Sequence, residues 1–172
     1  MADIKAGDNI IWKLPDKGDT LASVLSRILA WKDPSWKARS WKGWHEGYIV
    51  KVLDTGEIVT SQAVNAKEGV CAVTYSDVAA MGDCKIYHWL DNPDQVKIDQ
   101  YAAEHNGDKY DVMAYVWTII TYLFNLKFAI INNKETCWEN VSQFDRCMGK
   151  ELQPEDEMPL ISKMMNKLEG VK

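Results

Sequence analysis

The first half of the chain alternates short apolar and polar runs, interrupted by one segment with helical spacing. In residues 20–31 the apolar side chains fall at positions 21, 24, 25, 28 and 29, which predicts an amphipathic helix capped by Asp19 or Thr20. Short runs rich in Val, Ile and Tyr predict strands, and a turn at 54–56 joins two of them as a hairpin. The predicted strands cover residues 7–14, 45–53, 57–65, 69–75 and 84–90.

In the second half of the chain, apolar residues recur at the three- and four-residue spacing of helices. The predicted helices cover residues 93–106, 112–128, 137–148 and 158–168. Residues 112–131 are apolar for most of their length, and length alone would suit a membrane span. Polar residues at 118, 121, 125 and 127 favour a buried helix of a soluble fold over membrane contact. Early strands followed by helices predict an α+β domain with an antiparallel sheet.

Length and composition limit the class of protein. A chain of 172 residues suits one domain over residues 1–172, in which 150–172 form a linker and a last helix. The net charge of -5 argues against a nucleic-acid partner. The N-terminus has no apolar signal region, which predicts a cytoplasmic protein. The oligomeric state is left open by the sequence.

The four cysteines predict neither a metal site nor a disulfide framework. They lie at 71, 84, 137 and 147, without a C-x-x-C pair and without a histidine at zinc-finger spacing. We therefore expect thiols in a reducing compartment, with no metal and no cofactor.

Residues 32–44 form a predicted loop rich in Lys and Trp. Its indoles either pack onto the core or form an aromatic wall beside a binding cleft, and the sequence favours neither interpretation.

The strongest local signal for chemistry is the start of the helix at 137–148. Thr136 and Glu139 have the spacing of a capping box, which makes Cys137 the first residue of that helix. A thiol at a helix N-terminus is favoured as thiolate, and the nearby N–H groups suit an oxyanion. A small buried cysteine is the structural alternative.

A thiolate nucleophile needs a histidine, and the chain has three. His105 ends a helix and His88 lies in a strand, whereas His45 opens a strand and is followed by Gly47 on the same face. We expect this glycine to let the Cys137 helix approach the sheet. The third residue, which orients the imidazole, is either Gln62 or Glu57.

Several segments together resemble the permuted papain-like branch of the NlpC-type peptidase superfamily, particularly its YiiX-like proteins. The matching segments are G-D-N-I-I at 7–11, W-H-E-G-Y-I-V at 44–50, I-V-T-S-Q-A at 58–63, G-D-K-Y-D at 107–111 and T-C-W-E-N-V at 136–141. The histidine precedes the cysteine, as in the permuted order. The resemblance implies a circularly permuted papain-like fold, with an antiparallel sheet or partial barrel packed against helices.

The resemblance also implies roles for single residues. Cys137 is the nucleophile, His45 the general base, and Gln62 stands where the family often has Glu or His. Tyr110 borders the site and supplies a hydroxyl to the oxyanion, unless it is a core tyrosine, and Asp111 caps the next helix. Trp44 and Trp138, the neighbours of the reacting pair, are predicted to contact the substrate.

The expected activity is thiol hydrolysis of an amide or peptide bond through a thioester, on a cell-wall peptide or a lipid-linked substrate. Two alternatives stay open at this point. One is a lipid acyl hydrolase or acyltransferase, and the other is a binding module on the same fold that has lost activity.

Overall fold

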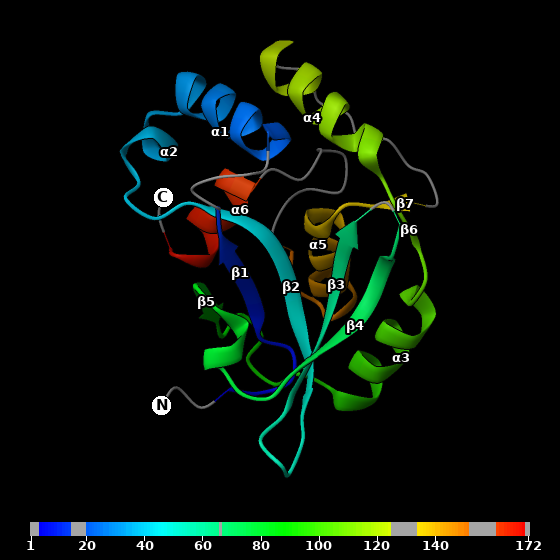
Figure 1. The fold of residues 1–172 in the computed structure, drawn as a ribbon. Helices are drawn as coiled ribbons and strands as arrows, with labels where there is room; N and C mark the ends of the chain where they lie inside the picture. Colours follow the sequence, from blue (N-terminus) through cyan, green and yellow to red (C-terminus); the bar gives the residue numbers. More distant parts are fainter. Residues whose placement is uncertain (1–3, 15–19, 66, 125–133, 152–160, 171–172) are drawn as a thin grey trace.

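A five-stranded antiparallel sheet organises the molecule, with strand order β4-β3-β2-β1-β5 (Figure 1). The computed structural model describes residues 4–14, 20–65, 67–124, 134–151 and 161–170. The strands of the sheet are β1 (Asn9–Lys13), β2 (Gly43–Val52), β3 (Ile58–Asn65), β4 (Gly69–Tyr75) and β5 (Cys84–Tyr87). The helices are α1 (Thr20–Lys32), α2 (Pro34–Ala38), α3 (Gln95–His105), α4 (Val112–Phe124), α5 (Cys137–Cys147) and α6 (Ile161–Leu168), with a short 3-10 turn, η1 (Ala79–Met81).

The α+β class and the antiparallel sheet are confirmed. The predicted hairpin joins β2 and β3, and β3 continues into β4, each pair antiparallel. β1 lies between β2 and β5. A separate parallel pair, β6 (Lys109–Tyr110) with β7 (Lys134–Glu135), lies beside it.

The two faces of the sheet bury different clusters, because side chains alternate along each strand. The face that meets α5 carries most of the core, which includes Ile11, Trp44, Tyr48, Val50, Ala63 and Val70. The opposite face buries a smaller cluster made of Ile10, Ile49, Ile58 and Met81. Along β2, alternate side chains therefore enter the larger core beneath α5 or the smaller cluster on the opposite face.

Aromatic packing fixes α5 against the sheet. The Phe144 ring stacks on the Tyr48 ring of β2 at 3.7 Å between centroids, and Tyr101 of α3 meets Phe144 edge-on at 5.6 Å. In Figure 1, α5 lies behind the sheet, α1 and α4 lie together at one end of the molecule, and the β2–β3 turn lies at the other.

The Trp-rich segment departs from the predicted loop. Residues 34–38 form α2, and Trp36 is buried with its indole nitrogen donating to Ser26 Oγ at 3.2 Å. Trp44 is buried as the second residue of β2, and Trp41 packs against the same core. The indoles thus belong to the core, which is the first of the two interpretations of this segment.

The prediction that α4 is a buried helix is wrong for one of its faces. Met113, Val116 and Phe124 are exposed. Residues 125–131 of the predicted apolar segment lie outside the described residues, as do the start of the last predicted helix at 158–160 and the proposed cap Asp19. No described helix combines the length and apolarity needed to cross a membrane.

Candidate functional site

The structure joins two of the predicted site residues directly. His45 of β2 and Gln62 of β3 lie on the same face of the hairpin, because Gly47 and Gln62 are paired across the strands and His45 is two residues before Gly47. His45 Nε2 and Gln62 Oε1 are 2.9 Å apart. The other candidate for the third residue, Glu57, accepts a bond from Thr55 beside the hairpin turn. The amide is therefore the partner of this histidine.

A chain of hydrogen bonds fixes the orientation of the Gln62 amide. Its nitrogen donates to Thr60 Oγ1 at 2.7 Å and to the Tyr75 hydroxyl at 3.0 Å. Thr60 Oγ1 in turn donates to the Val73 carbonyl. Because the amide nitrogen is committed to two oxygens, the amide oxygen faces His45 and accepts from Nε2. The imidazole then carries its proton on Nε2, and Nδ1 keeps the lone pair that a general base needs.

Burial lowers the pKa of His45 from its usual value, and the bond to Gln62 offsets part of that effect. Since the charged imidazolium is the form that burial disfavours, the ring is neutral near neutral pH. A neutral ring is competent to accept a proton, but its charged form is stabilised less than it would be beside a carboxylate.

Gly47 makes room for Gln62 and not for a helix. A Cβ at this position would lie 2.8 Å from the Ser61 carbonyl oxygen, 2.9 Å from Gln62 Cγ and 3.2 Å from the Trp12 ring. The prediction that this glycine lets the Cys137 helix approach the sheet is wrong. Its physical task is to let the Gln62 side chain cross the strand and reach His45.

Gly47→Ala should destabilise the fold by about 1–3 kcal/mol, because the added methyl group overlaps a backbone oxygen that cannot move aside. Urea unfolding measures this change. In a Gln62→Ala background the cost of Gly47→Ala should be smaller, since one of the overlapping atoms is gone. An equal cost in both backgrounds would mean that Gly47 does not make room for the Gln62 side chain.

Cys137 begins α5 as predicted. Thr136 is the N-cap, its hydroxyl accepts from the Glu139 backbone N–H at 3.2 Å, and the Glu139 carboxylate accepts from the Thr136 N–H at 2.8 Å. The capping box is therefore complete. The thiol lies at the positive end of an 11-residue helix, near the backbone N–H groups of the first turn. The Cys137 side chain is 1% exposed.

Two tryptophans tie the first turn of α5 to the start of β2. The Trp138 indole nitrogen donates to the Trp44 carbonyl oxygen at 3.0 Å, and the two rings meet edge-on at 5.5 Å. Cys137 and His45 are the chain neighbours of this pair. Both tryptophans are buried, which gives them a structural task; their contact with a substrate stays a prediction.

Cys137 and His45 approach β2 from opposite sides. Cys137 belongs to the core between α5 and the sheet, together with Trp44 and Tyr48. The His45 ring packs beside Trp12, at 5.2 Å between centroids, on the other face. The hydrogen bond from Trp138 to the Trp44 carbonyl is the contact that joins the first turn of α5 to the start of this strand.

Tyr110 and Asp111 lie where the 107–111 turn leads into α4. Tyr110 is half-buried in β6, opposite Glu135 of β7, and packs against the α5 core. Asp111 is buried immediately before α4. The roles predicted for them, at the oxyanion and as a cap, stay predictions.

Sequence reasoning missed the groups that support His45. Trp12 covers the imidazole, and its own indole nitrogen donates to the Met81 carbonyl at 2.9 Å. Thr60 and Tyr75 hold the Gln62 amide. Thr60 and Gln62 are two residues apart on one strand, so the sequence could have indicated that their side chains share a face. Trp12 and Tyr75 come from other strands, and no local pattern in the sequence indicates that they meet His45 and Gln62.

Sequence reasoning also missed a buried acidic pair on the α5 side of the sheet. Glu46 and Asp145 are both fully buried, and Asn9 Nδ2 donates to Asp145 Oδ2 at 2.8 Å. Burial raises the pKa of Asp145 to about 8, and the bond from Asn9 offsets part of this. Burial, and then the charge of Asp145, raise the pKa of Glu46 well above its usual value.

The other two histidines have carboxylate partners instead of an amide. His88 Nδ1 lies 2.9 Å from Asp8, and His105 Nδ1 lies 2.8 Å from Asp108. His45 thus differs from both in having a neutral partner.

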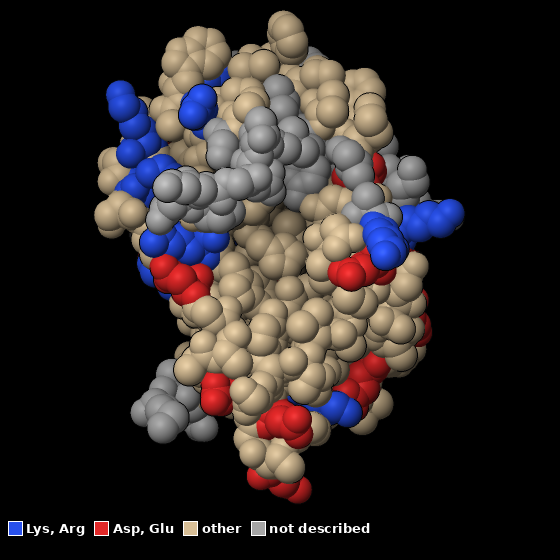
Figure 2. Space-filling model, in the orientation of Figure 1, with Lys and Arg blue, Asp and Glu red and all other residues tan. Residues whose placement is uncertain are grey.

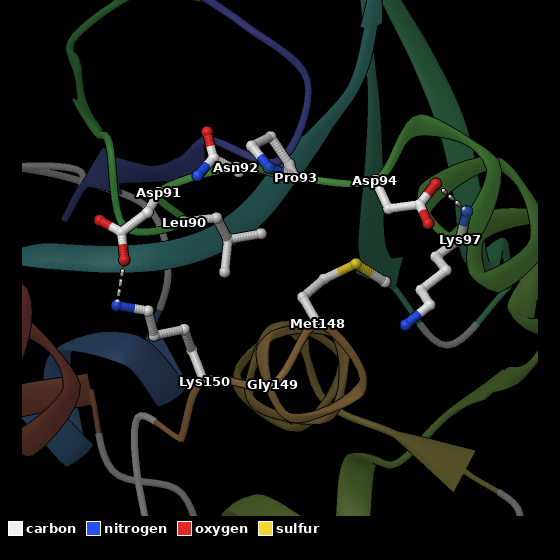
Figure 3. A pocket seen from close by; sticks show the side chains of 9 residues that line it. All are labelled: Leu90, Asp91, Asn92, Pro93, Asp94, Lys97, Met148, Gly149 and Lys150. Carbon is white, nitrogen blue, oxygen red and sulfur yellow. Dashed lines mark hydrogen bonds and ion pairs between the residues drawn. The ribbon is translucent and has the colours of Figure 1, made fainter.

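The four cysteines are outside any disulfide. Within the described ranges, no three His, Cys, Asp or Glu side chains are grouped so as to hold a metal ion. A pocket of about 290 Å³ lies at the C-terminal end of α5, opposite the Cys137 end, between Met148 and the connection into α3 (Figure 3). It is lined by side chains of both charges, including Asp91, Lys97 and Lys150, and is separate from the His45–Gln62 pair.

The chain matches no protein-family model, and no curated protein is significantly similar to it. The chemistry of the site therefore rests on the residues of this chain.

Proposed function

We propose that this chain is a cysteine hydrolase with a circularly permuted papain-like fold, which cleaves amide or peptide bonds through a thioester on Cys137. The observation that carries the proposal is the hydrogen bond between His45 and Gln62, which leaves Nδ1 of the ring as the base. The capping box at Thr136 adds a thiol at a helix N-terminus. The bond from Trp138 to the Trp44 carbonyl brings that helix end beside the histidine strand.

This mechanism requires the Cys137 and His45 side chains to meet around the start of β2. His45 Nδ1 then takes the thiol proton as Cys137 Sγ attacks the carbonyl carbon. The carbonyl oxygen becomes an oxyanion, which the first-turn N–H groups of α5 stabilise. The carbon–nitrogen bond then breaks, and His45 gives its proton to the leaving amine. Water adds to the thioester with the same base, which releases a carboxylic acid and restores the thiol. Gln62 holds the ring in place through both stages.

A second candidate, a binding module without activity on the same fold, is favoured by two observations. The Cys137 side chain is 1% exposed, and the His45 ring lies on the face of β2 that does not meet α5. The coupling between the two groups decides between the candidates.

The test is the pH dependence of Cys137 alkylation by iodoacetamide in the native chain and in His45→Ala. If the two groups are coupled, His45→Ala should slow alkylation near neutral pH by about tenfold and move the apparent pKa of Cys137 up toward the ordinary value of about 8.5. Peptide mapping separates Cys137 from the exposed Cys147, which reports reagent activity.

His105→Ala is the matched control, because that histidine pairs with Asp108. It should leave the Cys137 profile unchanged. An identical profile in the native chain and in His45→Ala would reject the hydrolase and leave the binding module. Once coupling is established, turnover of peptide amides against fatty-acyl esters separates an amide hydrolase from an acyl-lipid enzyme.

A further inference from the structure

We propose that the end of the molecule formed by α1 and α4 attaches this protein to the surface of an anionic lipid bilayer. The proposal does not depend on catalysis at Cys137. It rests on an exposed apolar face, on the charge around that face and on the way the two helices are joined.

The apolar face is made by residues at helical spacing on two neighbouring helices. On α4, Met113, Val116 and Phe124 follow one side of the helix, and Phe124 is 70% exposed. On α1, Val24 and Trp31 do the same, and Trp31 is 76% exposed. A soluble helix normally turns such a stripe inward, so this one is available to another apolar phase.

One lysine joins the two helices at the corner where the largest exposed rings lie. Lys32 Nζ donates to the carbonyl oxygens of Tyr122 at 2.6 Å and Leu123 at 2.7 Å. Trp31 and Phe124 are the chain neighbours of these residues. The two exposed aromatic side chains therefore project from one joined corner, and not from unrelated parts of the surface.

The charge at this end is opposite to that of the whole chain. Residues 20–42 contain five Lys or Arg and one Asp, a formal net charge of +4, whereas the whole chain carries -5. Arg39 is paired with Glu169, so the other four cations and Asp33 supply the charge of this segment. α4 has no charged residue. Arg27 and Lys37 are exposed. Arg27 has helical spacing with Val24 and Trp31 on α1, and Lys37 is on α2, which packs against α1. In Figure 2 a group of Lys and Arg side chains lies on the flank of α1 and α2, and a second group lies on the opposite flank. Several Asp and Glu side chains lie at the far end, near the β2–β3 turn, and others lie on both flanks.

This combination fits a lipid surface with negative headgroups. Apolar and aromatic side chains enter the boundary between headgroups and acyl chains, while Lys and Arg meet the anionic headgroups. The acidic end of the molecule then points away from the bilayer.

The test is co-sedimentation of the full chain with vesicles of phosphatidylcholine, with and without phosphatidylserine. The native chain should bind the vesicles that contain phosphatidylserine, and added salt should weaken binding. Trp31→Ala with Phe124→Ala should reduce binding at least tenfold. Arg27→Glu and Lys37→Glu should each reduce it by about fivefold or more, since one cation near the surface contributes about that factor.

Each variant has a matched control on α3, away from this face. Val96 is 74% exposed, so Val96→Ala removes an exposed apolar side chain elsewhere, and Lys97→Glu reverses an exposed charge elsewhere. Both controls should bind like the native chain. Cys137→Ser should also bind normally, which keeps this proposal separate from the catalytic one.

Absence of vesicle binding by the native chain, or equal binding by the Trp31/Phe124 variant, would overturn the proposal. Sedimentation velocity supplies a further outcome. If the native chain forms a dimer that the Trp31/Phe124 variant dissociates, and neither binds vesicles, the face joins two copies of this chain and the lipid proposal is rejected.

Discussion

Asp145→Asn should raise the free energy of unfolding at pH 7 by up to about 4 kcal/mol. Asp145 is fully buried, and its pKa is raised from 3.8 to about 8, mainly by burial. Between these two pH values the folded chain keeps a proton that the unfolded chain has lost. Stability therefore falls as the pH rises from about 4 to about 8 and changes little above that range.

The asparagine removes this cost because it cannot ionise, and its side-chain oxygen still accepts from Asn9 Nδ2. It also removes the negative charge that contributes to the raised pKa of Glu46, so the effects of Asp145→Asn and Glu46→Gln should not be additive. The pKa of Glu46 therefore depends on the charge of Asp145, in addition to burial.

Urea unfolding across this pH range measures the prediction. The gain of Asp145→Asn over the native chain should be small near pH 4 and largest near pH 8. Asp99→Asn, which changes an exposed carboxylate on α3, should show no such trend. A gain that is constant with pH would mean that Asp145 does not carry its proton in the folded state.

Trp138→Ala should lower the free energy of unfolding by about 3–5 kcal/mol, the range for deleting a large buried aromatic side chain. Trp138 is fully buried, packs edge-on against Trp44 and donates to its carbonyl oxygen. The substitution opens a cavity and removes the hydrogen bond that Trp138 donates to that carbonyl. It also releases the first turn of α5, with Cys137, from the strand that carries His45.

Trp138→Phe separates the two contributions. Phenylalanine keeps much of the ring packing but cannot donate, so it should cost about 1–3 kcal/mol. Trp31→Ala is the control for loss of an indole, and its effect should stay within about 0.5 kcal/mol because that side chain is exposed. Equal costs for Trp138→Ala and Trp31→Ala would contradict the role of Trp138 as the link between α5 and β2.

Local patterns in the sequence were enough for the main elements and for parts of the site. The alternation of Val, Ile and Tyr predicts the strands of the sheet, and the Thr136–Glu139 spacing predicts the start of α5 at Cys137. Gln62 was one of two candidates on the strand after His45, and the hydrogen bond to His45 distinguishes it from Glu57. These features depend on neighbours in the chain or on one hairpin, which periodicity and capping describe well.

Tertiary contacts decided the rest, because they depend on which strands and helices meet. The sequence alone does not say that Trp12 and Tyr75 come from other strands to enclose the His45–Gln62 pair, or that Gly47 serves Gln62 and not α5. It also predicts α4 as buried, because an apolar helix in a sequence looks the same whether its outer face meets protein or is exposed. The buried pair of Glu46 and Asp145 arises only when α5 packs on β2, since the two residues are far apart in the chain and burial is a property of the packed fold.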